Sequence, residues 1–260
     1  MSVHPQPEAW EHALSAFVRE WRDRPGVDGA ILGGSRAWGT ADEFSDVDVW
    51  IVMANRVRWR ERGLRRIGGY TIEYFANPAR MYPKYFAQAF GENVRSNARV
   101  FAYGRVLWDR RGAVARLQRW AGRAMRRSFA RPNRLTVETL KYGMWDTLDA
   151  LRSARASHVQ SFWRLYHQGI EFALSGYSSV VGAEQIAPAR TWQHLTDAAF
   201  RRRYRLARFP DARGARLFAA CLTAVTAPAA LARFARLTAY VQRRLGGFDP
   251  RRWRLRTPAR

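Results

Sequence analysis

The chain has 260 residues, of which 47% are hydrophobic, so it can bury a sizeable core as one large domain or two small ones. Its single cysteine, Cys221, excludes an internal disulfide, and no apolar run is long enough to cross a bilayer. The N-terminus lacks a basic segment followed by an apolar one, so we expect a cytoplasmic protein without a signal peptide and without a membrane partner.

The formal net charge of +24 is concentrated in the C-terminal part of the chain. The first 110 residues hold 16 basic and 13 acidic residues, whereas the remainder holds 29 and 8. A positive field of this size attracts polyanions such as RNA, DNA or an acidic protein. Arginines spread over solvated helix faces would give the same composition, since 43 of the 45 basic residues are arginine. Both interpretations stay open.

The first part of the chain has the pattern of a mixed α/β domain. Helical spacing of apolar residues over 6–24 ends at Pro25-Gly26, and a short apolar strand over 27–34 follows. Strand periodicity recurs over 46–53 and 70–78, and 79–90 follows Asn77-Pro78 as a helix. Residues 99–109 are expected to be one further extended segment.

From about Gly112 onward the apolar periodicity is helical. Helices are expected over 112–128, 134–156, 158–175, 190–206, 211–226 and 229–245, with breaks at proline residues and at the small-residue stretch 175–179. The sequence therefore predicts an α+β protein with a small mixed-sheet domain at 1–110, a helical bundle at 111–250 and a basic tail at 251–260.

Two carboxylates begin the second predicted strand. Asp46 and Asp48 are two residues apart, so both point to the same side of the strand. Magnesium prefers oxygen ligands at short distance, and a carboxylate pair with this spacing can share it. Phosphoryl and nucleotidyl transfer both use such ions, commonly two, to neutralise a triphosphate.

The turn before this strand has the composition of a phosphate-binding turn. The glycines Gly33 and Gly34 let backbone amides approach phosphate oxygens, and Ser35 adds a hydroxyl donor where a short helix is expected to start. Arg36 is a further candidate for a phosphate contact, although plain surface exposure is an equally good interpretation.

A third carboxylate, Glu73, is an isolated charge within the apolar strand 70–78. A charge is costly to bury there unless it meets a cation. On a strand next to the aspartate pair it would act as a further metal ligand or as the general base on an acceptor hydroxyl.

The sequence resembles the signature of the nucleotidyltransferase fold shared by DNA polymerase beta and the antibiotic nucleotidyltransferases. The resemblance consists of Gly34-Ser35, ten further residues and then Asp46-x-Asp48. The close resemblance covers residues 31–75, and the layout of a small α/β domain before a helical bundle is similar to that of aminoglycoside adenylyltransferases. It implies a nucleoside triphosphate, ATP, as co-substrate, two Mg²⁺ ions, and Glu73 in the place of the base. The implied reaction transfers AMP to a hydroxyl of a small molecule such as an aminoglycoside-type antibiotic, with release of pyrophosphate and resistance to the antibiotic.

The acceptor is less well defined by the sequence. Glu138, Asp146 and Asp149 lie close together on one expected helix and could bind an amine, or could equally pair with neighbouring basic residues. The basic bundle also suits a macromolecular acceptor, tRNA or a partner protein, as in antitoxin-type enzymes of this fold. A non-catalytic nucleotide-binding regulator is a third possibility, disfavoured because all three carboxylates are present.

Overall fold

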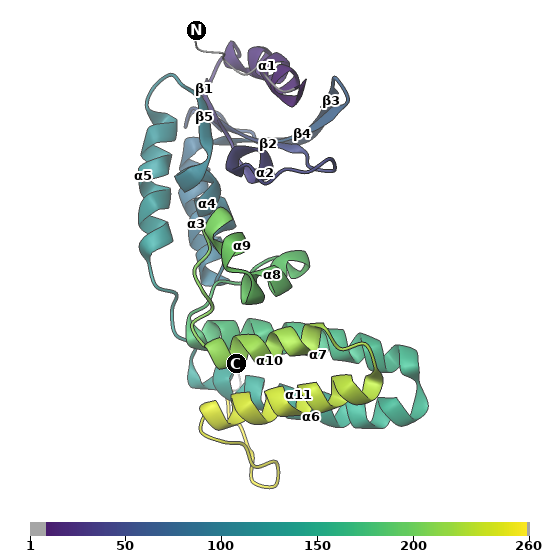
Figure 1. The fold of residues 1–260 in the computed structure, drawn as a ribbon. Coiled ribbons are helices and arrows are strands. Elements are labelled where there is room, and N and C mark those ends of the chain that lie inside the picture. The colour runs from purple at the N-terminus through teal and green to yellow at the C-terminus, as the bar shows by residue number, and fades with distance from the viewer. Residues whose placement is uncertain (1–8, 259–260) are drawn as a thin grey trace. The chain divides into compact units, whose positions relative to one another are not determined.

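The structure of the protein is a computed structural model that describes residues 9–258 (Figure 1). Its internal contacts divide the chain into two compact units, one ending at Arg127 and the other beginning at Ser128. The first unit contains the sheet and the second is helical, so the predicted α+β class is confirmed.

The sheet of the first unit has five strands within the described residues: β1 (Val27–Leu32), β2 (Val47–Met53), β3 (Glu61–Ile67), β4 (Tyr70–Pro78) and β5 (Arg105–Asp109). Their order is β3-β4-β2-β1-β5. The central strands β2 and β4 run parallel, and every other neighbouring pair is antiparallel. The sheet is therefore mixed, as the sequence predicted.

Helices cover both faces of this sheet. On one face α1 (Ala9–Arg22) packs Phe17 and Trp21 against the Tyr74 ring of β4, in a core that also contains Val49 of β2. On the other face lie α3 (Tyr82–Gly91), α4 (Ser96–Tyr103) and α5 (Ala113–Arg126), with Phe101 packed beneath Val52. The side chain of Asp48 alternates with Val49 along β2 and so belongs to this second face.

Two strand expectations need correction. The strand β3 was not predicted, because its seven residues are mostly exposed and include four charged side chains, and an edge strand of this kind lacks apolar alternation. The segment 99–109 is not one extended segment, because its first part belongs to α4 and only 105–109 forms a strand. Gly104 separates the two, and a Cβ there would lie 2.6 Å from the Leu32 carbonyl oxygen, so the chain turns in direct contact with β1.

The boundary between the units lies at Arg127, whereas residue 110 was expected. The helix in between, α5, packs against α4 and β1, and its apolar residues Val114 and Leu117 belong to the core that also contains Phe101. Helical periodicity alone therefore assigned this helix to the bundle, although its apolar face covers the sheet.

The second unit contains α6 (Arg134–Ser157), α7 (Val159–Val181), α8 (Thr191–Thr196), α9 (Ala198–Arg203), α10 (Ala212–Leu222) and α11 (Ala227–Arg244). Figure 1 shows α6, α7, α10 and α11 side by side. Their shared core contains the fully buried rings of Phe162, Tyr166, Phe218 and Phe234. This bundle matches the predicted helical architecture.

The helix α7 continues through residues 175–179, where a break was expected. A Cβ at Gly176 would lie 2.6 Å from the Leu140 side chain, so the glycine is there because α6 passes close to α7. The expected single helix over 190–206 is instead divided into α8 and α9 at Asp197, whose carboxylate accepts hydrogen bonds from the backbone N–H groups of Ala199 and Phe200.

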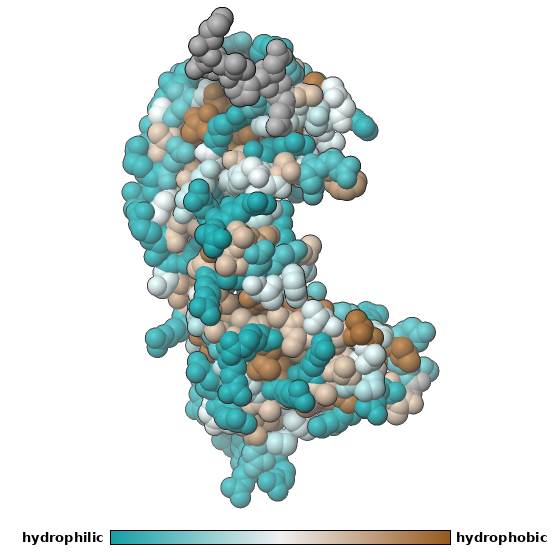
Figure 2. Space-filling model, in the orientation of Figure 1, coloured by the Kyte–Doolittle hydropathy of each residue, from teal (hydrophilic) through white to brown (hydrophobic). Residues whose placement is uncertain are grey.

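The basic tail is partly packed on the bundle. The Trp253 ring stacks on Tyr142 with a centroid separation of 4.5 Å, and its indole N–H donates to Glu138. The face drawn in Figure 2 has hydrophilic residues on each unit, with hydrophobic residues among them. Among the described residues, no helix combines the length and the apolar character that crossing a bilayer requires.

Candidate active site

The three predicted carboxylates converge. Asp46 immediately precedes β2, Asp48 lies within it, and Glu73 lies on the neighbouring strand β4. Parallel pairing places Asp48 directly beside Glu73 in the register. Each of the three side chains offers a carboxylate oxygen, these oxygens lie within 4.8 Å of one another, and all three residues are half-buried. This is a set of hard oxygen ligands that suits a divalent cation.

The turn before β2 is shaped by Asp48. The Gly33 N–H donates to the Asp48 carbonyl oxygen over 3.0 Å, and Gly34 has a positive φ of 63°. A Cβ on Gly34 would lie only 1.9 Å from the Asp48 Oδ2 atom. Glycine is therefore needed here both for the left-handed backbone and because the carboxylate lies against its Cα.

Ser35 and Arg36 belong to the short helix α2 (Gly34–Trp38) that follows this turn. The Ser35 carbonyl oxygen accepts a hydrogen bond from the Thr40 N–H over 2.9 Å, which closes the helix. Arg36 donates to the Ser45 carbonyl oxygen over 3.0 Å, and its guanidinium carbon lies 5.4 Å from the Trp10 ring and 5.6 Å from the Tyr70 ring. Arg36 thus holds the loop that leads to Asp46, and its phosphate contact stays a prediction.

The same loop is ordered by a second set of contacts. The Asp42 carboxylate accepts hydrogen bonds from the Ser45 hydroxyl at 2.7 Å and from the Phe44 N–H at 3.1 Å. The hydrogen bond from Ser45 lowers the pKa of Asp42. Asp42 therefore shapes the chain just before the carboxylate cluster, although it is not a member of the cluster.

Arg62 contacts the carboxylate cluster, although it was not predicted from the sequence. From the edge strand β3, its guanidinium donates twice to the Glu73 Oε1 atom, over 2.5 and 3.1 Å, and lies 4.8 Å from the Phe75 ring. Within the described residues, no hydrogen bond to the Glu73 Oε2 atom is found. Recognition of Glu61–Ile67 as a strand would have revealed this neighbour, since antiparallel pairing places Arg62 opposite Phe75.

A pocket of about 470 Å³ lies on the same face of the sheet as Asp48 and Glu73. Trp50 and Phe75, each two residues beyond one of these carboxylates, stack with ring centroids 5.1 Å apart and line it. Further along the wall, Arg60 donates to the Tyr85 hydroxyl, which in turn donates to Asn77. The pocket therefore combines an aromatic surface with polar groups beside the carboxylates.

Two of the three acidic residues expected to bind an acceptor have partners within the helical unit. Glu138 pairs with Lys141 at 2.6 Å, and Asp149 lies 4.0 Å from Arg152. Asp146 is exposed on the same helix. The structure favours local ion pairs, which the sequence had left open, and the role of these residues in acceptor binding stays a prediction.

Comparison with known proteins agrees with this geometry. The sequence pattern of the nucleotidyltransferase domain family matches residues 14–104, a stretch that contains the glycine turn and all three carboxylates.

The chain carries a nucleotidyltransferase domain.

Residues 14–104 thus form a nucleotidyltransferase domain, as the sequence signature predicted. A nucleotidyltransferase-like protein from Exiguobacterium sibiricum 255-15, of known crystal structure, is 12% identical, with a TM-score of 0.43 over 90% of this chain and 80% of the other. None of the curated proteins matches the chain in sequence. Residues 128–260 lie outside the matched nucleotidyltransferase domain.

Proposed function

We propose that this nucleotidyltransferase uses Mg²⁺ and ATP to transfer AMP to a hydroxyl group of a small molecule, of the kind that aminoglycoside-type antibiotics carry, and releases pyrophosphate. The observation that carries the proposal is the convergence of Asp46, Asp48 and Glu73 across the parallel pair β2 and β4. Nucleotidyl transfer requires a carboxylate cluster of this kind.

The residues present fit a magnesium site. All three offer carboxylate oxygens within 4.8 Å of one another, and the contact between Gly34 and Asp48 keeps the central ligand in place. Asp46 and Asp48 would hold two ions, with Glu73 as a third ligand. When bound, the ions neutralise charge on the triphosphate and align the reacting groups.

Glu73 would also act as the general base. Arg62 binds the Oε1 atom of its carboxylate, which leaves Oε2 to accept the proton of the acceptor hydroxyl. The acceptor oxygen then forms a bond to the α-phosphorus of ATP, while the bond from that phosphorus to the bridging oxygen breaks and pyrophosphate leaves. Gly34 and Ser35 would bind the triphosphate at the turn before β2.

The aromatic pocket offers a place for a substrate ring next to these groups. Trp50 and Phe75 supply an apolar surface, and Arg60, Asn77 and Tyr85 supply hydrogen-bonding groups around it. A pocket of about 470 Å³ is of the size that small-molecule sites commonly have. These dimensions support a small acceptor in preference to a macromolecule.

The test is transfer of label from α-labelled ATP in the presence of Mg²⁺, with aminoglycosides, other small hydroxylated antibiotics, bulk tRNA and cell lysate as separate acceptors. We expect label on a small molecule. Asp48→Asn should lower this transfer more than about 100-fold, since even the outer partners of metal ligands are worth about 10–100-fold. Asp23→Asn, which changes an 88% exposed carboxylate on the same unit, is the matched control.

Each outcome of this experiment decides something different. Label on RNA or protein would overturn the small acceptor and assign the basic surface a docking role, while the mechanism would stand. Undiminished transfer by folded Asp48→Asn would overturn the role of the carboxylates. A lack of transfer to any acceptor would favour a nucleotide-binding regulator.

A further inference from the structure

The pocket beside the carboxylate cluster carries positive charge. Arg60 immediately precedes the edge strand β3 and Arg62 lies within it, and both line the pocket of about 470 Å³. Arg62 already donates twice to Glu73. Arg60 donates to the Tyr85 hydroxyl over 3.1 Å, and within residues 9–258 it has no carboxylate partner. Arg60 therefore brings a positive charge to this pocket that no acidic side chain balances.

One acidic residue also borders the pocket, but its carboxylate is bound elsewhere. The Glu61 carboxylate accepts a hydrogen bond of 2.5 Å from the Tyr74 hydroxyl. The Tyr74 ring packs against Phe17 and Trp21 of α1, on the opposite face of the sheet. The charged groups on the pocket side of the edge strand are therefore the two guanidinium groups.

The groups that the pocket offers to a ligand are mainly hydrogen-bond donors. The Tyr85 hydroxyl donates to the Asn77 side chain over 3.2 Å, and the Tyr82 hydroxyl donates to the Ile51 carbonyl oxygen over 2.8 Å. A guanidinium has five N–H donors and no acceptor, and the bond to Tyr85 uses one of those of Arg60. The remaining N–H groups of Arg60 suit a ligand oxygen that accepts, above all a carboxylate.

The aromatic wall of the pocket has the same preference. Phe75 of β4 lies between Trp50 of β2, at a ring separation of 5.1 Å, and Arg62 of β3, whose guanidinium carbon is 4.8 Å from the Phe75 ring. Both faces of the Phe75 ring are thus covered, so a ligand meets its edge. The edge of an aromatic ring carries partial positive charge, which favours an anion over a cation.

The pocket lies on the side of the cluster where the proposed base is found. The strand order β3-β4-β2-β1 places Gly34, just after β1, on one side of Asp48, and Arg60, just before β3, on the other. Glu73 lies on β4, between Asp48 and β3. A triphosphate at Gly34 and a ligand at Arg60 would therefore approach the cluster from opposite sides, with the ligand next to the base.

We propose that this pocket binds the acceptor through an acidic group, a carboxylate that accepts hydrogen bonds from Arg60, while the acceptor hydroxyl lies toward Glu73. The proposal rests on the proposed function and narrows its acceptor to a small hydroxylated molecule with an acidic substituent. An ammonium group in the same place would meet the positive charge of Arg60, so a sugar acid should bind better than an amino sugar.

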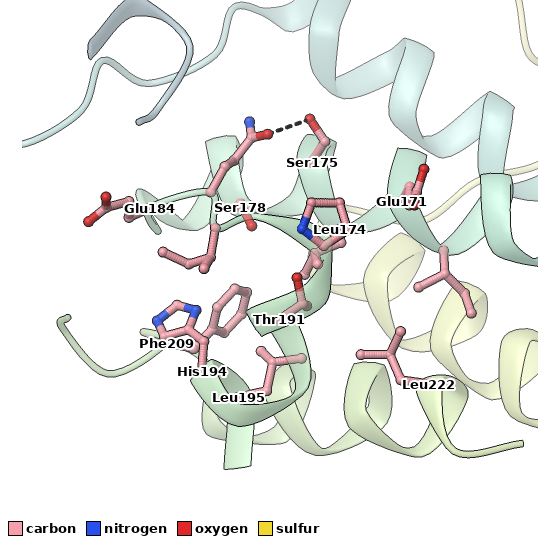
Figure 3. A pocket seen from close by; sticks show the side chains of 14 residues that line it. Glu171, Leu174, Ser175, Ser178, Glu184, Thr191, His194, Leu195, Phe209 and Leu222 are labelled. Carbon is pink, nitrogen blue, oxygen red and sulfur yellow. Dashed lines mark hydrogen bonds between the residues drawn. The ribbon is translucent and has the colours of Figure 1, made fainter. Parts of the chain in front are cut away.

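A second pocket, within the helical unit, provides a contrast (Figure 3). It has a volume of about 340 Å³, and its charged or titratable lining consists of Glu171, Glu184 and His194, without arginine or lysine. The His194 Nε2 atom lies 3.0 Å from the Ala207 carbonyl oxygen. Two carboxylates and one histidine disfavour an acid there, so an acidic probe distinguishes this pocket from the one beside Glu73.

The experiment is isothermal titration calorimetry of the full chain with Mg²⁺ and without nucleotide. The probes are phenyl glucuronide and phenyl glucoside, which differ in a carboxylate that replaces a hydroxymethyl group. We expect the glucuronide to bind about 5-fold more tightly, the upper range for an ion pair open to solvent. Arg60→Gln should remove this preference, and Arg60→Lys should keep part of it. Arg58→Gln removes the same charge outside the lining and should leave it unchanged.

Two further variants test the location. Asn97→Trp fills the pocket from α4 and should abolish binding of both probes, with the melting temperature used to verify folding. Leu174→Trp, which fills the pocket of the helical unit, is the matched control and should leave binding unchanged. The nucleotide analogue α,β-methylene-ATP, which cannot release pyrophosphate, should bind together with the glucuronide.

Equal binding of the two probes would overturn the proposal, and so would an acid preference that survives Arg60→Gln or persists in folded Asn97→Trp. Displacement of the glucuronide by α,β-methylene-ATP would assign Arg60 to the triphosphate and overturn it as well. In the transfer assay the glucuronide should receive label or inhibit labelling of another acceptor, and the absence of both effects would refute its place beside Glu73. Because binding is measured without transfer, a failure of the proposed function in the Asp48→Asn test is distinguishable from a failure of the acid preference.

Discussion

Replacement of Gly34 by alanine should disable the active site with only a moderate effect on stability. A Cβ at this position would lie 1.9 Å from the Asp48 Oδ2 atom, where contacts under 3.0 Å are not tolerated. The carboxylate must therefore move by about 1 Å, and a misplacement of that size can cost about 100-fold in rate. A 100-fold loss corresponds to about 2.7 kcal/mol of transition-state stabilisation.

The effect on folding is smaller and can be measured separately. The positive φ of Gly34 costs an alanine roughly 1–2 kcal/mol, which corresponds to a fall of roughly 2–8 °C in melting temperature for a chain of this size. Gly39→Ala is the matched control, because Gly39 has a similar φ of 66° but nothing within 4 Å of the added Cβ. Both variants should lose similar stability, and only Gly34→Ala should lose activity.

Two assays measure this difference. One is nucleotidyl transfer to the acceptor found in the screen described above, expressed as kcat/KM. The other is Mn²⁺ binding followed by electron paramagnetic resonance, which needs no acceptor. If folded Gly34→Ala binds Mn²⁺ and transfers nucleotide as Gly39→Ala does, the steric contact with Asp48 has no part in the function and the reasoning is refuted.

Two further predictions concern residues that contact a carboxylate. Removal of the guanidinium in Arg62→Ala should lower the Mg²⁺ concentration that gives half-maximal transfer by up to about 5-fold, since an exposed ion pair is worth about 1 kcal/mol or less. Arg66→Ala on the same strand is the control. A higher Mg²⁺ requirement in Arg62→Ala would contradict the prediction. In the helical unit, burial tends to raise the pKa of Asp211, but hydrogen bonds from Tyr177, a backbone N–H and Tyr240 outweigh it and lower the pKa. The stabilising effect of Asp211 is therefore complete above the unfolded pKa of about 3.8 and is lost as the pH falls through the lower folded value. Between pH 6 and pH 2, the melting temperature should therefore fall less steeply for Asp211→Asn than for the unmodified protein. An equal slope for both proteins would show that the ionised carboxylate adds nothing.

Much of the carboxylate cluster could be predicted from sequence because its signals are local. Asp46 and Asp48 belong to one strand, and the glycine turn lies a fixed interval before them. The isolated charge at Glu73 identified the third carboxylate, because an apolar strand gives no other reason for it. What the pattern could not provide was the parallel register that places Glu73 beside Asp48, since that depends on long-range pairing.

The errors have a common physical origin in tertiary contacts. The small residues around Gly176 looked like a helix break, but they permit the close approach of α6 and α7. The apolar face of α5 looked like part of the bundle, but it covers the sheet. Helical periodicity shows that a face is buried and does not show against which element it is buried.

The missed strand β3 led to the missed neighbour of Glu73. Its residues are charged because it lies at the edge of the sheet, and a strand without apolar alternation resembles a loop in sequence. The contact of Arg62 with Glu73 is therefore known only from the structure. The same holds for the stacking of Trp50 on Phe75, which forms one wall of the adjacent pocket.

The charged edge strand has a consequence for how copies of the protein meet. An edge strand presents unpaired backbone groups that can pair with the edge of another molecule and begin aggregation. Arg62, Arg65 and Arg66 lie on this edge, and Arg65 is tied to Glu20 of α1 by an ion pair of 3.0 Å. Two such edges would bring like charges opposite each other, which opposes pairing. The arginines of β3 therefore oppose edge-to-edge pairing of two such sheets, in addition to the contact that Arg62 makes with Glu73.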